Sequence, residues 1–440
     1  MKKIASALFF MGIVIFSSCI KKPTEIPVEN IPPDTHIFVE GTVDTVPAKQ
    51  VIHWWGNDPD GYVVGYYYNW DDSPDTIFTT LKVDTFTLQA SDTINFHTLK
   101  VWALDNENAW DPTPAVLTIP VKNSPPTVEF VRNTLPPDTT LPVATFYFEG
   151  HDIDGDQSVG GFYWRLDFED DTVIHFIERD TGYVTIRNIP EGERTITVWA
   201  VDESHALSDS ITHTWYVIPV VGDILFLDDN TSSQADNFYR QIMDNNFFGQ
   251  YTYYRIEYGL PYSPFDVNAI INELGFDYII WYTGDDYEHF SYAQKYIETY
   301  LSNHKKLFLI SPACLNSFYN PENPSPFMSQ FLGVDTVTAW DKFILKGYNI
   351  IPQASGYDTL EVQLSLISKF DGFEVTPDAT PLYRLPDFTA WQGNPVCALK
   401  KPDQNPDLVF FSIQFHALDG RGNAESIFLH ILRDELGYTK

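Results

Sequence analysis

Hydrophobic residues follow two different patterns along the chain, which change near residue 222. Before this point, apolar and polar residues alternate over short segments such as Thr145–Phe148, Phe162–Leu166 and Thr195–Trp199. Asp, Pro and Gly separate these segments, and no stretch has the 3.6-residue period of an amphipathic helix. This part is therefore predicted to be an all-β structure of antiparallel strands, each with one buried face.

After residue 222, segments that are apolar throughout alternate with segments of helical period. The predicted strands are Asp223–Leu227, Tyr251–Ile256, Tyr278–Tyr282, Lys306–Ile310 and Leu408–Ile413. The predicted helices are Ser233–Asn246, Val267–Leu274, Tyr292–Ser302 with Ser291 as N-cap, and Ala424–Leu436. Such alternation favours an α/β fold, a doubly wound parallel sheet with helices on both faces. Residues 320–408, with short strands at Thr359–Leu364 and Pro395–Leu399, are predicted to form an antiparallel extension or lid.

An internal repeat divides the first part into two domains. The block His53–Gly61 is echoed by Phe148–Gly155, and Val101–Asp105 is echoed by Val198–Asp202 at nearly the same offset. Two blocks that keep one offset indicate duplication. An Asp-x-Asp-Gly turn and a Val-Trp-Ala-x-Asp strand resemble those of the fibronectin type III-like domains of bacterial surface proteins. The resemblance implies immunoglobulin-like sandwiches at residues 34–122 and 125–220, which the proline-rich segment 122–126 joins.

The element order of residues 222–440 resembles that of class I glutamine amidotransferase-like domains, which have a flavodoxin-like fold. Their catalytic members have a Gly-x-Cys-x-Gly turn after the fourth strand and a late Gln-Phe-His-Pro-Glu motif. Here Cys314 and His416 match the nucleophile and the base. Pro312 and Asn316 replace the two glycines, and the acidic Asp419 lies one residue too far along.

These departures remove the small residues that a strained nucleophile turn needs. The resemblance therefore implies a non-catalytic domain. The alternative is an exported thiol hydrolase or amidase that uses Cys314, His416 and Asp419. The chain contains no His-Glu-x-x-His, Gly-x-Ser-x-Gly, phosphate-binding or dinucleotide-binding motif, so no organic cofactor is expected.

Aspartates in two places suggest calcium or another divalent cation. Asp152, Asp154 and Asp156 alternate like the start of a calcium loop, but Gln157 and Tyr163 stand where an EF-hand needs Gly and Glu. An Asx-turn is the alternative for this segment. The second place is the expected ligand-binding edge of the parallel sheet, because ligands of such sheets lie beyond the carboxyl ends of the strands. That edge holds Asp228, Asp229, Thr283, Gly284, Asp285 and the residues after Ile310.

The composition is strongly acidic and poor in cysteine. Lys and Arg total 27 against 60 Asp and Glu, a formal net charge of −33. Such a surface repels phosphate groups, so nucleic acid is excluded as a partner. Beyond Cys19, the cysteines are Cys314 and Cys397, and their spacing leaves a disulfide open.

The N-terminal residues predict export. Lys2 and Lys3 precede the apolar run Ile4–Phe16, which is shorter than the ~20 residues of a membrane-spanning helix. The run ends in Phe16-Ser17-Ser18-Cys19, which resembles a bacterial lipobox although Phe16 replaces the usual aliphatic residue. The resemblance implies a signal peptide at residues 1–19, lipid on Cys19 and a tether at 20–33. An ordinary secretory signal cut near Ser18 is the alternative.

Together these features predict a lipoprotein of the bacterial cell envelope, held at the outer membrane or cell surface by Cys19. The sandwiches would act as spacers for a non-catalytic α/β domain. That domain would bind a protein or glycan partner, since the many aromatic residues offer apolar faces with polar tips.

Overall fold

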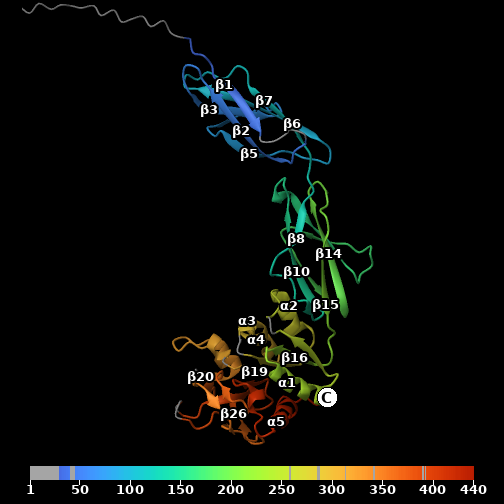
Figure 1. The fold of residues 1–440 in the computed structure, drawn as a ribbon, viewed down its shortest axis with the longest axis vertical. Coiled ribbons are helices and arrows are strands. Elements are labelled where there is room, and N and C mark those ends of the chain that lie inside the picture. Colours follow the sequence, from blue (N-terminus) through green and yellow to red (C-terminus); the bar gives the residue numbers. More distant parts are fainter. Residues whose placement is uncertain are drawn as a thin grey trace, which may run out of the picture. The chain divides into compact units, whose positions relative to one another are not determined.

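The computed structural model describes residues 29–39, 45–256, 259–284, 288–312, 314–339, 342–388, 391 and 393–440 (Figure 1). The predicted signal peptide, Cys19 and residues 20–28 of the predicted tether lie outside these residues, as does Asp285. The chain divides into two compact units, residues 1–124 and 125–440. No helix among the described residues is both long enough and apolar enough to cross a membrane.

The first unit contains a β-sandwich of a three-stranded and a four-stranded sheet. One sheet has the order β1-β2-β5 and the other β4-β3-β6-β7, with antiparallel pairing throughout. The strands are β1 (Asp34–Val39), β2 (Lys49–Asn57), β3 (Val63–Trp70), β4 (Ile77–Thr79), β5 (Val83–Thr87), β6 (Asn95–Asp105) and β7 (Ala115–Val121). Alternate residues of β6, among them Leu99, Val101 and Ala103, are buried against Trp54 of β2.

The second unit begins with a second sandwich, whose sheets have the orders β13-β10-β8 and β12-β11-β14-β15-β9. Its strands are β8 (Thr127–Phe130), β9 (Thr139–Thr140), β10 (Val143–His151), β11 (Val159–Leu166), β12 (His175–Glu178), β13 (Tyr183–Arg187), β14 (Gly192–Asp202) and β15 (Ile211–Val217). The strand predictions around Phe146, Trp164 and Val198 are confirmed. Register shifts at Val63/Gly65 and at Val159/Gly161 occur at corresponding places, as expected of a duplication.

The rest of the second unit is built on a mixed sheet. Its parallel part has the order β17-β16-β18-β19-β28, and β27, β26, β22 and β23 continue it antiparallel. The parallel strands are β16 (Ile224–Asp229), β17 (Tyr251–Arg255), β18 (Tyr278–Thr283), β19 (Lys306–Ile310) and β28 (Leu408–Phe411). Numbered along the chain, this order is 2-1-3-4-5, the flavodoxin-like order of doubly wound sheets.

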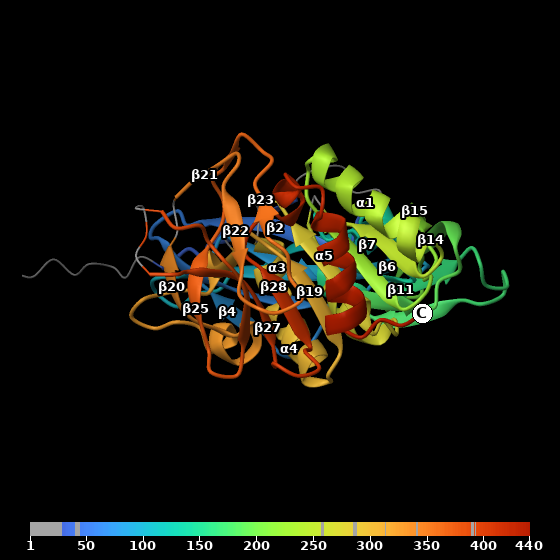
Figure 2. The ribbon, with the colours of Figure 1, turned by 90° about the horizontal axis from the view of Figure 1, so that it is seen from below.

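Helices cover both faces of this sheet. Helices α1 (Ser233–Phe247) and α5 (Ala424–His430) cover one face, and α4 (Gln294–Ser302) lies on the other (Figure 2). Buried residues of α2 (Pro264–Asn268) pack in the same core as those of α4. Side chains alternate between the faces, so Phe226 joins the first core and Leu227 the second. The short helix α3 (Glu288–Tyr292) follows β18.

The predicted antiparallel extension is present between β19 and β28. It contains β20 (Val334–Ala339), β21 (Ile344–Leu345), β22 (Asn349–Pro352), β23 (Leu360–Glu361), β24 (Leu366–Ile367), β25 (Gly372–Val375), β26 (Thr380–Arg384) and β27 (Val396–Lys401). The strand predicted at Thr359–Leu364 is reduced to β23. The strand predicted at Pro395–Leu399 is β27.

One helix start was predicted wrongly. Ser291 lies inside α3, and α4 begins at Gln294 after Ala293, which makes no side-chain cap. Two other predicted helices are shorter than expected because their second halves wind as π-helical turns, Ala269–Glu273 after α2 and Ile431–Glu435 after α5. Ser263, whose hydroxyl accepts a hydrogen bond from the N–H of Phe265, is the N-cap of α2.

A buried seam joins the second sandwich to the mixed sheet. Leu141 and Val143 of the sandwich belong to the same core as Leu225 and Val267. Asp266, only 2% exposed, accepts hydrogen bonds from the N–H and the hydroxyl of Thr145, at 3.0 and 2.6 Å. These contacts place both parts in one compact unit.

Candidate functional site

The structure brings together the polar residues predicted at the ends of the parallel strands. The N–H of Gly284 donates to the carbonyl of Asp229 at 2.8 Å, and Asn230 Nδ2 donates to the carbonyl of Thr283 at 3.2 Å. These contacts lie between β16 and β18, where the strand order reverses. In sheets of this order, that reversal opens the crevice in which ligands bind.

Asp228 is fully buried, and protein donors surround its carboxylate. The Tyr253 hydroxyl donates to Oδ2 at 2.5 Å, the N–H of Asn230 donates to Oδ1 at 3.1 Å, and Arg255 Nε lies 3.7 Å from Oδ2. Burial raises the pKa of the Asp228 carboxyl above its ordinary value, although these hydrogen bonds oppose the shift. The Asp228 carboxylate therefore holds the end of β16 in place through its hydrogen bonds to Asn230 and Tyr253.

Asp229 orients a histidine that carries no signal in the sequence. Its side chain is 1% exposed, and its Oδ1 lies 2.6 Å from Nδ1 of His289 in α3. Trp281 Nε1 donates to Oδ2 at 3.3 Å. Because a carboxylate accepts hydrogen bonds, Nδ1 of His289 carries a proton and donates it to Asp229. Nε2 lies on the side of Gly259, at 3.5 Å from where a Cβ on that residue would stand.

An open pocket of about 700 Å³ adjoins this histidine. Its walls come from the connections that follow β17, β18 and β19, so it lies at the carboxyl ends of three parallel strands. We call it the strand-end pocket; its lining residues are Gly259, Leu260, Pro261, Tyr262, His289, Ser291, Tyr292 and Ser317. Tyr262 and Tyr292 are 57% and 51% exposed. The pocket offers aromatic faces, hydroxyls and an imidazole, groups that suit a ligand with both apolar and polar surface.

The two described aspartates predicted to hold a divalent cation at this edge contact protein groups. Asp228 and Asp229 bind tyrosine, tryptophan, histidine and backbone donors, and Asp285 lies outside the described residues. The cation site there stays a prediction.

Cys314 lies in the core on one face of the mixed sheet. It begins a 3₁₀ turn after β19, is 0% exposed, and packs in the cluster that contains Leu309 and Phe410. Burial raises the pKa of its thiol far above the ordinary value, and the nearby Asp371 raises it further. Cys314 and Cys397 are both free thiols, so the disulfide left open by the sequence is not formed.

His416 lies on the opposite face of the sheet. It occupies a 3₁₀ turn after β28, and its ring contacts that of Tyr239, at 5.8 Å between centroids, in the core that contains Phe411. Burial lowers its pKa to about 4. Asp419 accepts a hydrogen bond from the N–H of Ala424 at 2.9 Å and so caps the start of α5. Cys314 and His416 thus pack in two different cores, and Asp419 caps a helix. This geometry does not support a Cys314 thiolate that His416 prepares for attack.

The acidic turn of the second sandwich contains the Asx-turn that the sequence also allowed, and the calcium site there stays a prediction. Asp152 accepts hydrogen bonds from the N–H of Asp154 and the hydroxyl of Ser158, both at 2.8 Å. Asp156 accepts one from the N–H of Asp152 at 3.1 Å. These carboxylate oxygens hold the bend closed, and burial raises the pKa of Asp152.

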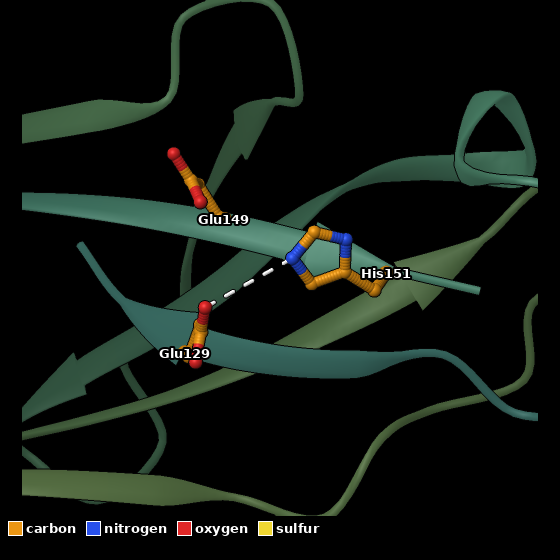
Figure 3. A group of neighbouring side chains, drawn as sticks. All are labelled: Glu129, Glu149 and His151. Atoms are coloured by element: carbon orange, nitrogen blue, oxygen red, sulfur yellow. Dashed lines mark ion pairs between the residues drawn. The ribbon is translucent and has the colours of Figure 1, made fainter. Parts of the chain in front are cut away.

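A group that the sequence did not reveal lies beside this turn. Figure 3 shows Glu129 of β8 with Glu149 and His151 of β10, and one potential metal-binding atom of each lies within 4.8 Å of the others. His151 Nε2 is 3.9 Å from Glu129, and its Nδ1 is 3.6 Å from Asp156. All three side chains of the group are exposed. At this exposure the group forms a solvated ion pair of little energy.

Comparison with known proteins concerns the sandwiches. No family model and no curated protein matches the chain. The fibronectin type III-like modules of Clostridium thermocellum CbhA match at 17% identity and a TM-score of 0.20, covering 42% of this chain and 95% of theirs. Two fibronectin type III domains of chicken tenascin match at 12% identity and 0.23, covering 43% and 99%.

A third similar structure is the PKD1 domain of the Vibrio cholerae metalloprotease PrtV, at 15% identity and a TM-score of 0.17. It covers 21% of this chain and 99% of that domain. The chain's own strand pairings confirm the predicted β-sandwich folds.

Proposed function

We propose that this chain is a lipid-anchored binding protein of the bacterial cell envelope. In this proposal the two sandwiches act as spacers, and the strand-end pocket binds a glycan or peptide segment. The observation that carries it is the pocket itself, in which His289, held by the buried Asp229, stands beside Tyr262 and Tyr292. A positioned imidazole next to exposed aromatic rings supplies directional hydrogen bonds and apolar contact together.

The proposal includes a fold assignment for residues 222–440. We infer a doubly wound domain of the class I glutamine amidotransferase-like type that lacks catalytic activity. The 2-1-3-4-5 order of the parallel strands supports it. The separation of Cys314 and His416 into cores on opposite faces supports the non-catalytic form.

Binding assays with defined probes test the proposed site. A panel of soluble envelope oligosaccharides and short peptides is titrated against the full chain by calorimetry, and each bound probe is then tested on Tyr292→Ala and His289→Ala. We expect affinity to fall at least tenfold in both variants. Tyr216→Ala, which alters a tyrosine of β15 that is 46% exposed, is the matched control and is expected to bind as the unaltered chain does. Unchanged affinity in both pocket variants would place binding elsewhere, and no binding across the panel would reject the function.

A further inference from the structure

The two sandwiches have the same turn after the Val-Trp-Ala-x-Asp strand. Asn108 and His205 both adopt a left-handed backbone, with φ of 69° and 68°. The N–H of Asp105 donates to the carbonyl of Ala109, and the N–H of Asp202 to that of Ala206, at 3.1 Å in each case. The next residues, Trp110 and Leu207, form corresponding bridges to Leu104 and Val201. Trp110 and Leu207 therefore occupy equivalent positions.

In the first sandwich, the tryptophan of this turn covers an aromatic surface. Trp110 stacks on Tyr67, with ring centroids 4.2 Å apart and planes at 9°. Tyr67 pairs in register with Trp102 of β6, and its ring is 5.1 Å from that of Phe78. The chain thus fills this aromatic site with one of its own side chains.

In the second sandwich, the same aromatic surface is present but the covering ring is missing. Tyr163 pairs in register with Trp199, and its ring is 5.1 Å from that of Phe176. Leu207 stands where the first sandwich has tryptophan. A pocket of about 450 Å³ lies here, and its lining residues are Tyr163, Ile174, Trp199, Val201, His205 and Leu207. We call it the sandwich pocket. Ile174 and Leu207 are 53% and 51% exposed.

We propose that the sandwich pocket binds a tryptophan side chain of a basic segment of a partner polypeptide, in the place that Trp110 fills in the first sandwich. A ring inserted against Tyr163 and Trp199 would bury aromatic surface on both sides, the arrangement that concentrates binding energy in protein interfaces. The chain has a net charge of −33, and complementary charge steers and orients a partner. We therefore place basic residues next to the tryptophan in the partner segment. This site is independent of the strand-end pocket.

Fluorine NMR on the full chain tests the proposal. The probe is the peptide Lys-Trp-Lys with a fluorinated indole, and unlabelled Lys-Trp-Lys, Lys-Ala-Lys and a cello-oligosaccharide serve as competitors. We expect the fluorine resonance of the probe to broaden on binding. Of the three competitors, only unlabelled Lys-Trp-Lys should displace the probe and sharpen the resonance again. Displacement by Lys-Ala-Lys to the same extent would reduce the binding to charge, and displacement by the oligosaccharide would make the surface a glycan platform. Either result would overturn the proposal.

Exchange of the two turn residues gives matched variants. Leu207→Trp supplies the missing ring from within and should lower binding at least tenfold, whereas Trp110→Leu opens the first sandwich and should double the peptide bound per chain. Thermal unfolding checks that both variants fold, and Trp199→Leu removes a pocket wall by a second route. Tyr216→Ala, which alters an exposed tyrosine of β15 outside the pocket lining, should leave peptide binding unchanged. Undiminished binding in both Leu207→Trp and Trp199→Leu would refute the assignment.

Discussion

The buried carboxylates at the end of β16 accept hydrogen bonds from aromatic side chains. Asp228 accepts from the Tyr253 hydroxyl, and Asp229 accepts from Trp281 and contacts His289. Removing one donor of such a buried acceptor costs more than an average hydrogen bond, because the acceptor stays buried without its partner.

Tyr253→Phe should therefore destabilise the protein by about 1–3 kcal/mol. Tyr251→Phe is the control on the same strand, since the Tyr251 hydroxyl donates to Asp244, whose side chain is exposed. Its loss should cost about 0.5 kcal/mol or less, because water replaces the hydroxyl. Urea unfolding followed by tryptophan fluorescence measures both. An equal loss in the two variants would show that the burial of Asp228 adds nothing.

Individual site residues could be predicted from the sequence only where they directly follow a recognisable strand. Asp228 and Asp229 end a continuous apolar run, so their place at the sheet edge followed from the pattern. His289 lies far along the chain from Asp229 and has no local signature, and only the adjacency of β16 and β18 joins the two. Cys314 and His416 matched a motif by spacing, but side-chain direction separates them, and spacing carries no such information.

At the scale of elements, the contact between β10 and α2 includes a buried titratable group, the carboxyl of Asp266. Asp266 receives both hydrogen bonds of Thr145, and Phe265 stacks on Tyr183 at 5.1 Å. Burial raises the pKa of Asp266 to about 6, whereas an unfolded aspartate titrates near about 3.9. Between these values the folded state keeps a proton that the unfolded state has lost. The contribution of Asp266 to stability is therefore present at low pH and is lost as the pH rises through about 6.

Asp266→Asn should remove this pH dependence. The amide does not titrate and still accepts from the Thr145 N–H. Relative to the unaltered chain, the variant should gain about 1–3 kcal/mol in free energy of unfolding between pH 4 and pH 7. Urea midpoints measured across that range check it. Parallel pH profiles of the two proteins would contradict a raised pKa at this position.

Strands were easier to predict than helices for a physical reason. The apolar run Tyr278–Tyr282 can be buried only as an interior strand, so its pattern leaves little choice. Ser291 is a good N-cap by type, yet α3 already includes it, because the packing of Phe290 in the core, not the capping serine, sets where this helix lies. The two-residue β23 pairs with β22 at the end of the mixed sheet, and Glu361 also bridges Asp419. Its sequence pattern does not set its length.

At the scale of the whole molecule, the proposed function depends on the N-terminal cysteine. Cys19→Ala should abolish incorporation of labelled fatty acid in a bacterial host and move the chain from the detergent phase to the aqueous phase on Triton partitioning, because lipid chains supply the membrane affinity. Cys314→Ala is the matched control, since that thiol is buried in the folded chain, and should keep the lipid. Lipid that persists in Cys19→Ala would refute the anchor.

The seam at Thr145 and Asp266 has a practical consequence for anyone who clones this protein. A recombinant fragment that starts at residue 222 would deprive Asp266 of both donors and strip the apolar cover of Leu141 and Val143 from Val267. Such a fragment would expose an apolar surface prone to aggregation and leave the Asp266 carboxyl group without its hydrogen-bond donors. A fragment that starts at Pro125 keeps the whole seam, and it is the piece to express and crystallise.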